Sequence, residues 1–176
     1  LGGFHKTDLI ILAGRPSMGK TALATNIAFK MVNTKSIDDE NKKNIVGFFS
    51  LEMSSEQLAT RILAEDSSIS SEKIRRGQLN SNDFQKIVQS SQKLENLSLY
   101  IDDSPNLSIS ALRTRARRLK RKYGLDAIVI DYLQLMRPSL SRPDNRVLEI
   151  AEMTRNLKAL AKELDIPVLC LSQLSR

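Results

Sequence analysis

The sequence predicts an α/β fold, in which a mainly parallel sheet carries helices on both of its faces. Short continuous apolar runs recur along the chain, and amphipathic stretches with helical spacing lie between them. Strands that alternate with helices form right-handed crossover units, and these place helices on both sides of one sheet. The length of 176 residues, 41% of them apolar, fits a single domain with one buried core.

The predicted strands are runs of apolar residues, most of them rich in β-branched side chains. They lie at residues 8–13, 45–50, 97–102, 126–131 and 167–172. Because these runs are nearly continuous in apolar character, we expect the strands to be buried on both faces, as in a parallel sheet.

Helical spacing of apolar residues predicts helices at residues 21–32, 54–64, 82–94, 108–123 and 144–164. Ser54 and Gln57 form a capping-box pattern at the start of the second helix. Segments 33–44 and 136–143 lack this patterning and are expected to be loops. The residues expected to face the core include Leu23, Ile27 and Met31 in the first helix, Phe84, Ile87 and Val88 in the third, and Val147, Ile150 and Met153 in the last.

The composition favours a polyanionic partner and excludes several classes of site. Lysine and arginine number 27 against 20 aspartates and glutamates, and the resulting net charge of +7 favours contact with nucleic acid or nucleotides. The single cysteine, Cys170, excludes an internal disulfide and a cysteine-cluster zinc site, and its apolar neighbours predict a buried thiol. The single histidine, His5, excludes histidine-based metal chemistry and a Ser-His triad.

The chain carries no pattern for membrane insertion or secretion. Its longest apolar run, residues 9–13, is far shorter than the roughly 20 residues that span a bilayer. The chain begins with Leu1 and not with methionine, so we expect it to be a fragment of a longer protein.

The most specific motif is a phosphate-binding loop, GxxxxGK[ST], between the first predicted strand and the first predicted helix. Glycines let the backbone turn tightly and approach phosphate oxygens, and the helix N-terminus then faces the anion. Lys20 would place its charge on the β- and γ-phosphates, and Thr21 would offer its hydroxyl to Mg²⁺. The predicted nucleotide-binding residues are Gly14, Arg15, Pro16, Ser17, Met18, Gly19, Lys20 and Thr21.

Polar residues at the ends of three other predicted strands complete a candidate site, because sites in parallel sheets lie at the carboxyl ends of the strands. Asp131 ends an apolar strand and could hold Mg²⁺ through water, or cap the next turn. Glu52 follows residues 45–50 and could deprotonate the attacking water, or serve as a solvated or helix-capping acid next to Ser54. Gln173 could contact the γ-phosphate, or be an ordinary loop amide.

Taken together, these motifs resemble the RecA-like motor domain of the DnaB-type replicative DNA helicases. The matching segments are GRPSMGKT at 14–21, SLEMSSEQLATRIL at 50–63, IVIDYLQLM at 128–136 and LSQLSR at 171–176. They occur in the family's order and cover nearly the whole chain, and the combination of SLEM with DYLQLM is the most specific part. The resemblance implies a three-layer RecA-like P-loop NTPase, in which the strand of Gln173 lies between the P-loop strand and the strand of Asp131.

The resemblance also implies a function and a set of partners. The family forms ring-shaped hexamers that hydrolyse ATP with Mg²⁺, move along single-stranded DNA and unwind the duplex in the bacterial cytoplasm, at the replisome. Primase and a helicase loader are the implied partners. Carried over by residue, Lys20 and Thr21 bind phosphate and Mg²⁺, Glu52 activates water, Asp131 is the second Mg²⁺ acid, and Gln173 senses the γ-phosphate.

Residues 1–176 would be a truncated motor core, without the N-terminal primase-interacting domain or the C-terminal end that carries the arginine finger. We therefore expect the chain alone to bind ATP weakly and hydrolyse it slowly. Single-strand contacts are expected from Arg137, Arg142 and Arg146, although a solvated loop is the alternative.

The helix at 108–123 holds the charge excess of the chain, and a solvated outer face, a subunit contact and a DNA contact are its possible roles in that order. Its basic residues are Arg113, Arg115, Arg117, Arg118, Lys120, Arg121 and Lys122. Two other functions stay open for the whole chain: a recombination or repair ATPase of the RecA/RadA type, and a nucleotide-dependent regulatory module with a RecA-like fold.

Overall fold

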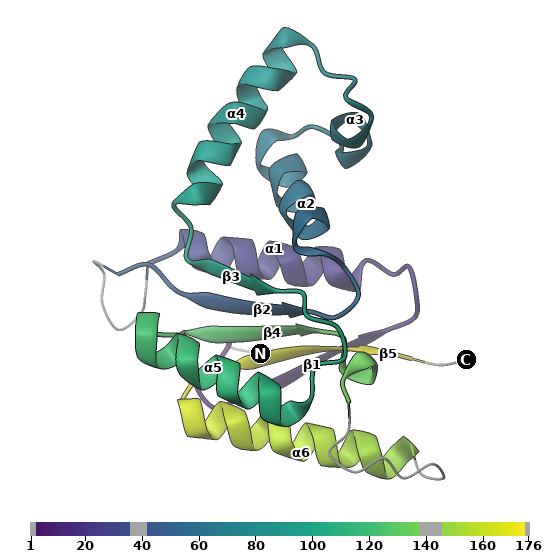
Figure 1. Ribbon diagram of the computed structural model, residues 1–176, viewed down its shortest axis with the longest axis vertical. Coiled ribbons are helices and arrows are strands. Elements are labelled where there is room, and N and C mark those ends of the chain that lie inside the picture. The colour runs from purple at the N-terminus through teal and green to yellow at the C-terminus, as the bar shows by residue number, and fades with distance from the viewer. Residues whose placement is uncertain (1–2, 36–41, 138–145, 175–176) are drawn as a thin grey trace.

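The sheet contains five parallel strands in the order β1-β5-β4-β2-β3, within residues 3–35, 42–137 and 146–174, which the computed structural model describes (Figure 1). The strands are β1 (Leu9–Gly14), β2 (Val46–Ser50), β3 (Leu99–Asp102), β4 (Ala127–Asp131) and β5 (Val168–Gln173). Every neighbouring pair is parallel. The strand order places β5 between β1 and β4, as the family resemblance implied.

Helices cover both faces of this sheet, so the predicted three-layer α/β fold is confirmed. They are α1 (Lys20–Asn33), α2 (Ser55–Ser67), α3 (Ser71–Arg76), α4 (Ser81–Glu95), α5 (Ile109–Tyr123), the 3₁₀ helix η1 (Leu133–Leu135) and α6 (Arg146–Leu164). Figure 1 shows α1 on one face and α5 and α6 on the other, while α2, α3 and α4 project beyond α1. None of the helices in the described residues combines the length and apolar character needed to cross a membrane.

Strand β4 shows how the two layers share the sheet. Ile128 and Ile130 pack in one cluster with residues of α5 and α6, whereas Val129 packs in a second cluster with residues of α1. All three side chains are fully buried, as the alternation of side chains along a doubly covered strand requires. Cys170 on β5 is also fully buried, as predicted, and burial raises the pKa of its thiol to about 12.

The face predicted for α1 is correct in part. Ile27 and Met31 pack against the core as expected, whereas Leu23 is half exposed. The centre of the buried face is formed by Ala24 and Ala28, together with Phe29 and Val32. Small side chains allow α1 to lie close against the sheet, so periodicity that counts only large apolar residues missed the alanines and misplaced Leu23.

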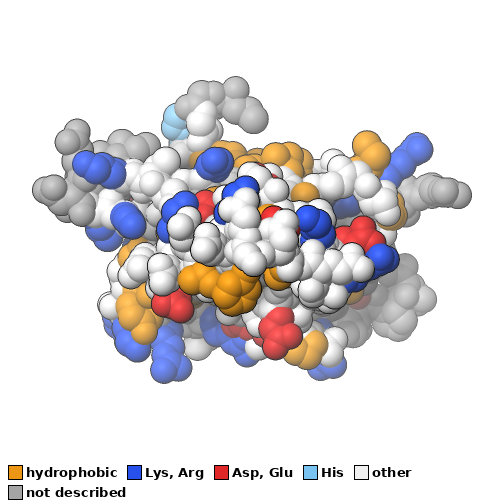
Figure 2. All heavy atoms as spheres, turned by 90° about the horizontal axis from the view of Figure 1, so that it is seen from above, with side chains coloured by type: hydrophobic (Ala, Val, Ile, Leu, Met, Phe, Trp, Pro, Cys, Tyr) orange, Lys and Arg blue, Asp and Glu red, His pale blue; other side chains and the backbone are white. Residues whose placement is uncertain are grey.

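The face predicted for α4 is also wrong, because α4 packs against α2 and not on the sheet. Phe84 and Val88 are exposed, while the buried side chains of α4 are Asp83 and Ser90. Asp83 accepts a hydrogen bond from Lys73 of α3 at 3.1 Å, and this bond lowers the pKa of its carboxyl group. Figure 2, seen from above the α4 end, shows apolar side chains at the surface among charged ones.

Two further differences from the predictions concern the short helix α3 and the first turn of α6. Helix α3 was not predicted, because its six residues are too few to show a period. It is defined instead by its caps: Ser70 accepts a hydrogen bond from the backbone N–H of Lys73, and Gly77 follows in the left-handed region at φ +65°. Val147, expected in the core, is 75% exposed in the first turn of α6.

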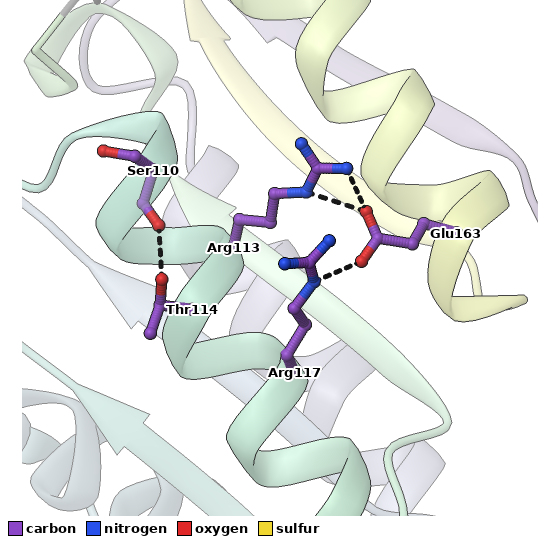
Figure 3. Close-up of polar contacts among 5 residues, drawn as sticks. All are labelled: Ser110, Arg113, Thr114, Arg117 and Glu163. Atoms are coloured by element: carbon purple, nitrogen blue, oxygen red, sulfur yellow. Dashed lines mark hydrogen bonds and ion pairs between the residues drawn. The ribbon is translucent and has the colours of Figure 1, made fainter.

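The basic helix α5 is not simply a solvated face, because part of its charge is paired within the chain. Arg113 and Arg117 both bond to Glu163 of α6 (Figure 3). These bonds, with that of Arg117 the stronger influence, lower the pKa of the Glu163 carboxyl group. Arg115 reaches the strand side and bonds to Asp102, the last residue of β3, at 2.6 Å.

Candidate nucleotide-binding site

The predicted P-loop connects the end of β1 to the start of α1. Two of its residues adopt left-handed backbone conformations, Ser17 at φ +62° and Gly19 at φ +80°. Lys20 folds back over the loop and donates from Nζ to the carbonyl oxygen of Arg15 at 2.9 Å. A Cβ atom on Gly14 would lie 3.3 Å from Cδ of Lys20, so glycine at this position leaves room for the lysine side chain.

Asp131 is the last residue of β4, which is separated from the P-loop strand β1 by β5. It is almost completely buried, with 1% of its surface exposed. Thr21, in the first turn of α1, lies close enough for its side chain to lower the pKa of this carboxyl group. One carboxylate oxygen, Oδ2, is buried without a hydrogen-bond partner among the described residues. A buried carboxylate oxygen that lacks a protein donor, beside a threonine hydroxyl, suits the shell of a divalent cation.

The pKa of Asp131 is raised above its ordinary value. Burial is the largest cause, and the nearby charge of Glu52 acts in the same direction. The hydrogen bond from Thr21 and the charges of Lys20 and Arg61 oppose this rise. A cation placed at this carboxylate would therefore relieve an unfavourable charge.

Glu52 lies at the tip of a tight turn that follows β2. Ser50 is buried and closes the turn: its Oγ donates to the carbonyl oxygen of Met53 at 2.6 Å and accepts from the N–H of Met53 at 3.3 Å. The cap of α2 is Ser54, which forms the predicted capping box with Gln57. Glu52 is exposed and is not the helix cap, which removes one of the alternatives for this residue.

Gln173 is the last residue of β5 and pairs with Gly14, the last residue of β1. On its other side lies Gln134 of η1, whose Oε1 accepts from the N–H of Gln173 at 3.1 Å and whose Nε2 donates to the carbonyl oxygen of Gln173 at 2.9 Å. The carboxyl ends of β1, β5, β4 and β2 thus bring Lys20, Thr21, Gln173, Asp131 and Glu52 to one edge of the sheet.

Sequence reasoning missed three residues of this edge. Ser50 and Gln134 lie inside the recognised SLEM and DYLQLM segments, which was the available signal for them. Arg61 of α2, which lies in the matching segment at 50–63, is half buried and close enough for its charge to act on Asp131. Within the described residues, no group of three histidine, cysteine or acidic side chains could hold a metal by itself.

The predicted DNA contacts are placed only in part. Arg137 is exposed just after η1, and its backbone N–H donates to the carbonyl oxygen of Leu107 at 3.1 Å. Arg146 is the first residue of α6. Arg142 lies outside the described residues. Of the three arginines, the side chain of Arg137 is the one that the structure describes.

Comparison with known proteins gives one consistent family. The model of the DnaB-like helicase C-terminal domain matches residues 1–176. The replicative DNA helicase DnaB of Rickettsia prowazekii is 55% identical over 100% of this chain and 37% of its own length. The replicative DNA helicase DnaB of Geobacillus stearothermophilus is 48% identical over 99% of this chain and 37% of its own length. The chain thus spans little more than a third of these curated relatives.

Solved structures give the same picture. An ATPase domain superposes with a TM-score of 0.88 at 34% identity, covering 99% of this chain and 60% of that one. A DnaB-like replicative helicase, described with its interactions with primase, superposes with a TM-score of 0.82 at 34% identity, covering 99% of this chain and 40% of that one. The RadB recombinase shares the fold, with a TM-score of 0.52 at 17% identity over 98% of this chain and 64% of that one.

Proposed function

Because the chain belongs to the DnaB-like helicase C-terminal domain family, we propose that it is the ATP-driven motor of a replicative DNA helicase. The membership itself confirms the expected family and implies nucleotide binding. The observation that carries the proposal is the meeting of Thr21, Asp131 and Glu52 beside the P-loop, at one edge of the sheet.

The nucleotide is ATP, and it binds with Mg²⁺. The backbone N–H groups of the P-loop and the ammonium group of Lys20 hold the phosphates. Thr21 and Asp131 hold the cation, and the buried Oδ2 of Asp131 supports this assignment. When bound, Mg²⁺ neutralises charge on the β- and γ-phosphate oxygens during phosphoryl transfer.

Glu52 orients the attacking water and accepts its proton. The turn closed by Ser50 holds Glu52 at the carboxyl edge, and its exposure leaves it accessible to a water molecule on the phosphate side. Gln173 contacts the γ-phosphate and reports its loss to the adjoining strands. Lys20, Glu52 and Gln173 are thus the proposed catalytic residues.

The proposed partners follow from the family. They are single-stranded DNA, further copies of the chain in a hexameric ring, primase and a helicase loader. The structural neighbour described with primase supports the primase contact. Sequence-independent contacts of Arg137, Arg142 and Arg146 with the DNA backbone are proposed for single-strand binding.

The other two functions fit less well. A recombination ATPase would match the solved recombinase in more than fold, yet the identity to RadB is 17% against 34% for the helicase. A regulatory module does not need a water-activating carboxylate, so the position of Glu52 argues against it.

The proposal is tested by strand displacement on a forked DNA duplex. It is measured with the complete helicase protein and with its Glu52→Gln variant. We expect unwinding by the wild type, and loss of unwinding with ATP binding retained in the variant. Glu56→Gln, which removes an exposed carboxylate from the first turn of α2, is the matched control and should unwind normally. A wild-type chain that hydrolyses ATP without unwinding would favour one of the other two functions.

A further inference from the structure

We propose that Gln134 is a positioning residue of the motor, which holds the backbone of Gln173 so that the Gln173 side chain meets the γ-phosphate. This inference rests on the proposed role of Gln173 as a sensor.

Strands β4 and β5 separate before β5 ends. Their paired residues end at Ile130 and Cys170, because the chain leaves the sheet after β4 to form η1. Strand β5 continues for three more residues, and their backbone groups on this side lose the partners that a neighbouring strand would supply. A substitute is needed there if the end of β5 is to stay fixed.

The side chain of Gln134 is that substitute. Its Oε1 accepts from the N–H of Gln173 at 3.1 Å, and its Nε2 donates at 2.9 Å both to the carbonyl oxygen of Gln173 and to Oγ of Ser172. One primary amide thus pairs with both backbone groups of a single residue, as a strand neighbour would. A primary amide carries a donor and an acceptor side by side on one planar group, as this pairing requires.

The opposite side of Gln173 is fixed as well. Gly14 of the P-loop strand is its paired residue, and the N–H of Leu174 donates to the carbonyl oxygen of Gly14 at 3.1 Å. Gln173 is therefore held between the P-loop and η1, with its backbone anchored on both sides. An anchored backbone lowers the cost of presenting the side chain, and a misplacement of about 1 Å can reduce a rate by roughly 100-fold.

The test is steady-state ATP hydrolysis by the full-length chain with single-stranded DNA, comparing kcat and KM for Gln134→Leu and Gln134→Glu with wild type. Leucine removes the hydrogen bonds to Ser172 and Gln173. Glutamate keeps the size and the acceptor but places a carboxylate against the carbonyl oxygen of Gln173. We expect kcat to fall by about 10-fold or more in both, and KM for ATP to change by less than about threefold, because P-loop contacts persist. Gln92→Glu makes the same charge change at an exposed position of α4 and should leave both constants unchanged.

A double-mutant cycle with Gln173→Ala shows whether Gln134 acts through Gln173. We expect Gln134→Leu to lower kcat by less than about twofold in the Gln173→Ala background, because the side chain being positioned is already absent. An equal loss in both backgrounds overturns the inference, and so does an unchanged kcat in the single variants. The sensor role itself is tested by the Gln173→Ala single variant, which leaves Gln134 unchanged. A normal kcat in that variant overturns the sensor role. Failure of both Gln134 variants to fold would assign Gln134 a purely structural role and also overturn the inference.

Discussion

The backbone N–H of Leu51 donates to the carbonyl oxygen of Asp131 at 2.7 Å. This bond lies one residue before Glu52, so it links the turn that carries the proposed water-activating residue directly to the backbone of the proposed Mg²⁺ ligand. The charges of Glu52 and Asp131 also act on each other, and the pKa of Asp131 rises in part for this reason. The charge of Glu52 therefore acts on the carboxylate that we propose to hold Mg²⁺.

Asp131→Asn should stabilise the nucleotide-free protein and abolish its Mg²⁺-dependent ATPase activity. Because the folded-state pKa of Asp131 is raised, mainly by burial, its ionisation opposes folding. Its contribution to stability is present at low pH and is lost as the pH rises through the folded-state pKa. A gain of about 1 kcal/mol would raise the melting temperature by roughly 2–4 °C. Thermal melting at neutral and acidic pH checks this, with the gain expected to shrink in acid. A lower melting temperature at neutral pH would contradict the argument.

Gly19→Ala should weaken ATP binding by about 10-fold or more, because alanine is strained in a left-handed conformation and the loop would have to change shape. Gly77→Ala is a close control. Gly77 has a similar positive φ and equally open surroundings, but it ends α3, away from the P-loop. Both variants should lose a similar amount of stability, and fluorescent-nucleotide titration should show weaker binding only for Gly19→Ala. Equal affinity in the two variants would remove the special role of this glycine.

Ser50→Ala should lower kcat for ATP hydrolysis by about 10-fold without a comparable change in KM, because the turn that presents Glu52 loses its closing hydroxyl. The carbonyl oxygen of Met53 also loses this donor, and a hydrogen bond of this kind contributes about 1 kcal/mol to stability. Ser67→Ala provides the control for stability alone. Ser67 is a buried serine of α2 whose Oγ likewise donates to a backbone carbonyl oxygen, at 2.6 Å. If Ser67→Ala reduced kcat equally, the effect at Ser50 would reflect stability and not the position of Glu52.

Glu163→Gln should lower the melting temperature at neutral pH, because it removes the carboxylate that Arg113 and Arg117 share. The pKa of Glu163 is lowered in the folded state, so its stabilising contribution is present above the unfolded-state pKa and is lost as the pH falls through the folded-state value. The effect should therefore vanish in acid and weaken at high salt. Glu152→Gln, a carboxylate elsewhere on α6, is the control. Equal losses from both substitutions would argue against a specific role for the shared carboxylate.

Arg137→Ala in the full-length chain should reduce the salt dependence of single-stranded DNA affinity by about one phosphate contact, equivalent to a change of roughly 0.7 in the log–log slope. Arg121→Ala removes the same charge from an exposed position on α5 and should leave the slope unchanged. Binding isotherms between low and moderate salt measure both. A slope that is unchanged in Arg137→Ala would place the DNA path elsewhere.

The sequence predicted the strands and the P-loop well because both signals are local. A continuous apolar run such as the one ending at Asp131 has few alternatives to a buried strand, and Gly14 to Thr21 specify their loop within eight residues. The order of the strands is not local information. It came from the family resemblance, since apolar runs alone do not say which strands are neighbours.

The remaining parts depend on contacts between distant segments. Gln134 and Gln173 are 39 residues apart, and no pattern in either segment shows that one amide will complete the edge of the other strand. The face of α4 and part of the face of α1 were predicted wrongly for a related reason. Periodicity identifies an apolar face, but it does not say whether the surface opposite is the sheet, as for Ala24, or another helix, as for Asp83.

The carboxylate that Arg113 and Arg117 share has a consequence for how polyanions compete for this protein. A phosphate chain that approached α5 would have to displace Glu163 from Arg113 and Arg117, and Asp102 from Arg115, before it gained those contacts. The exchange replaces one anion by another and releases little energy. The positive charge of α5 is thus partly compensated within the chain before any partner arrives.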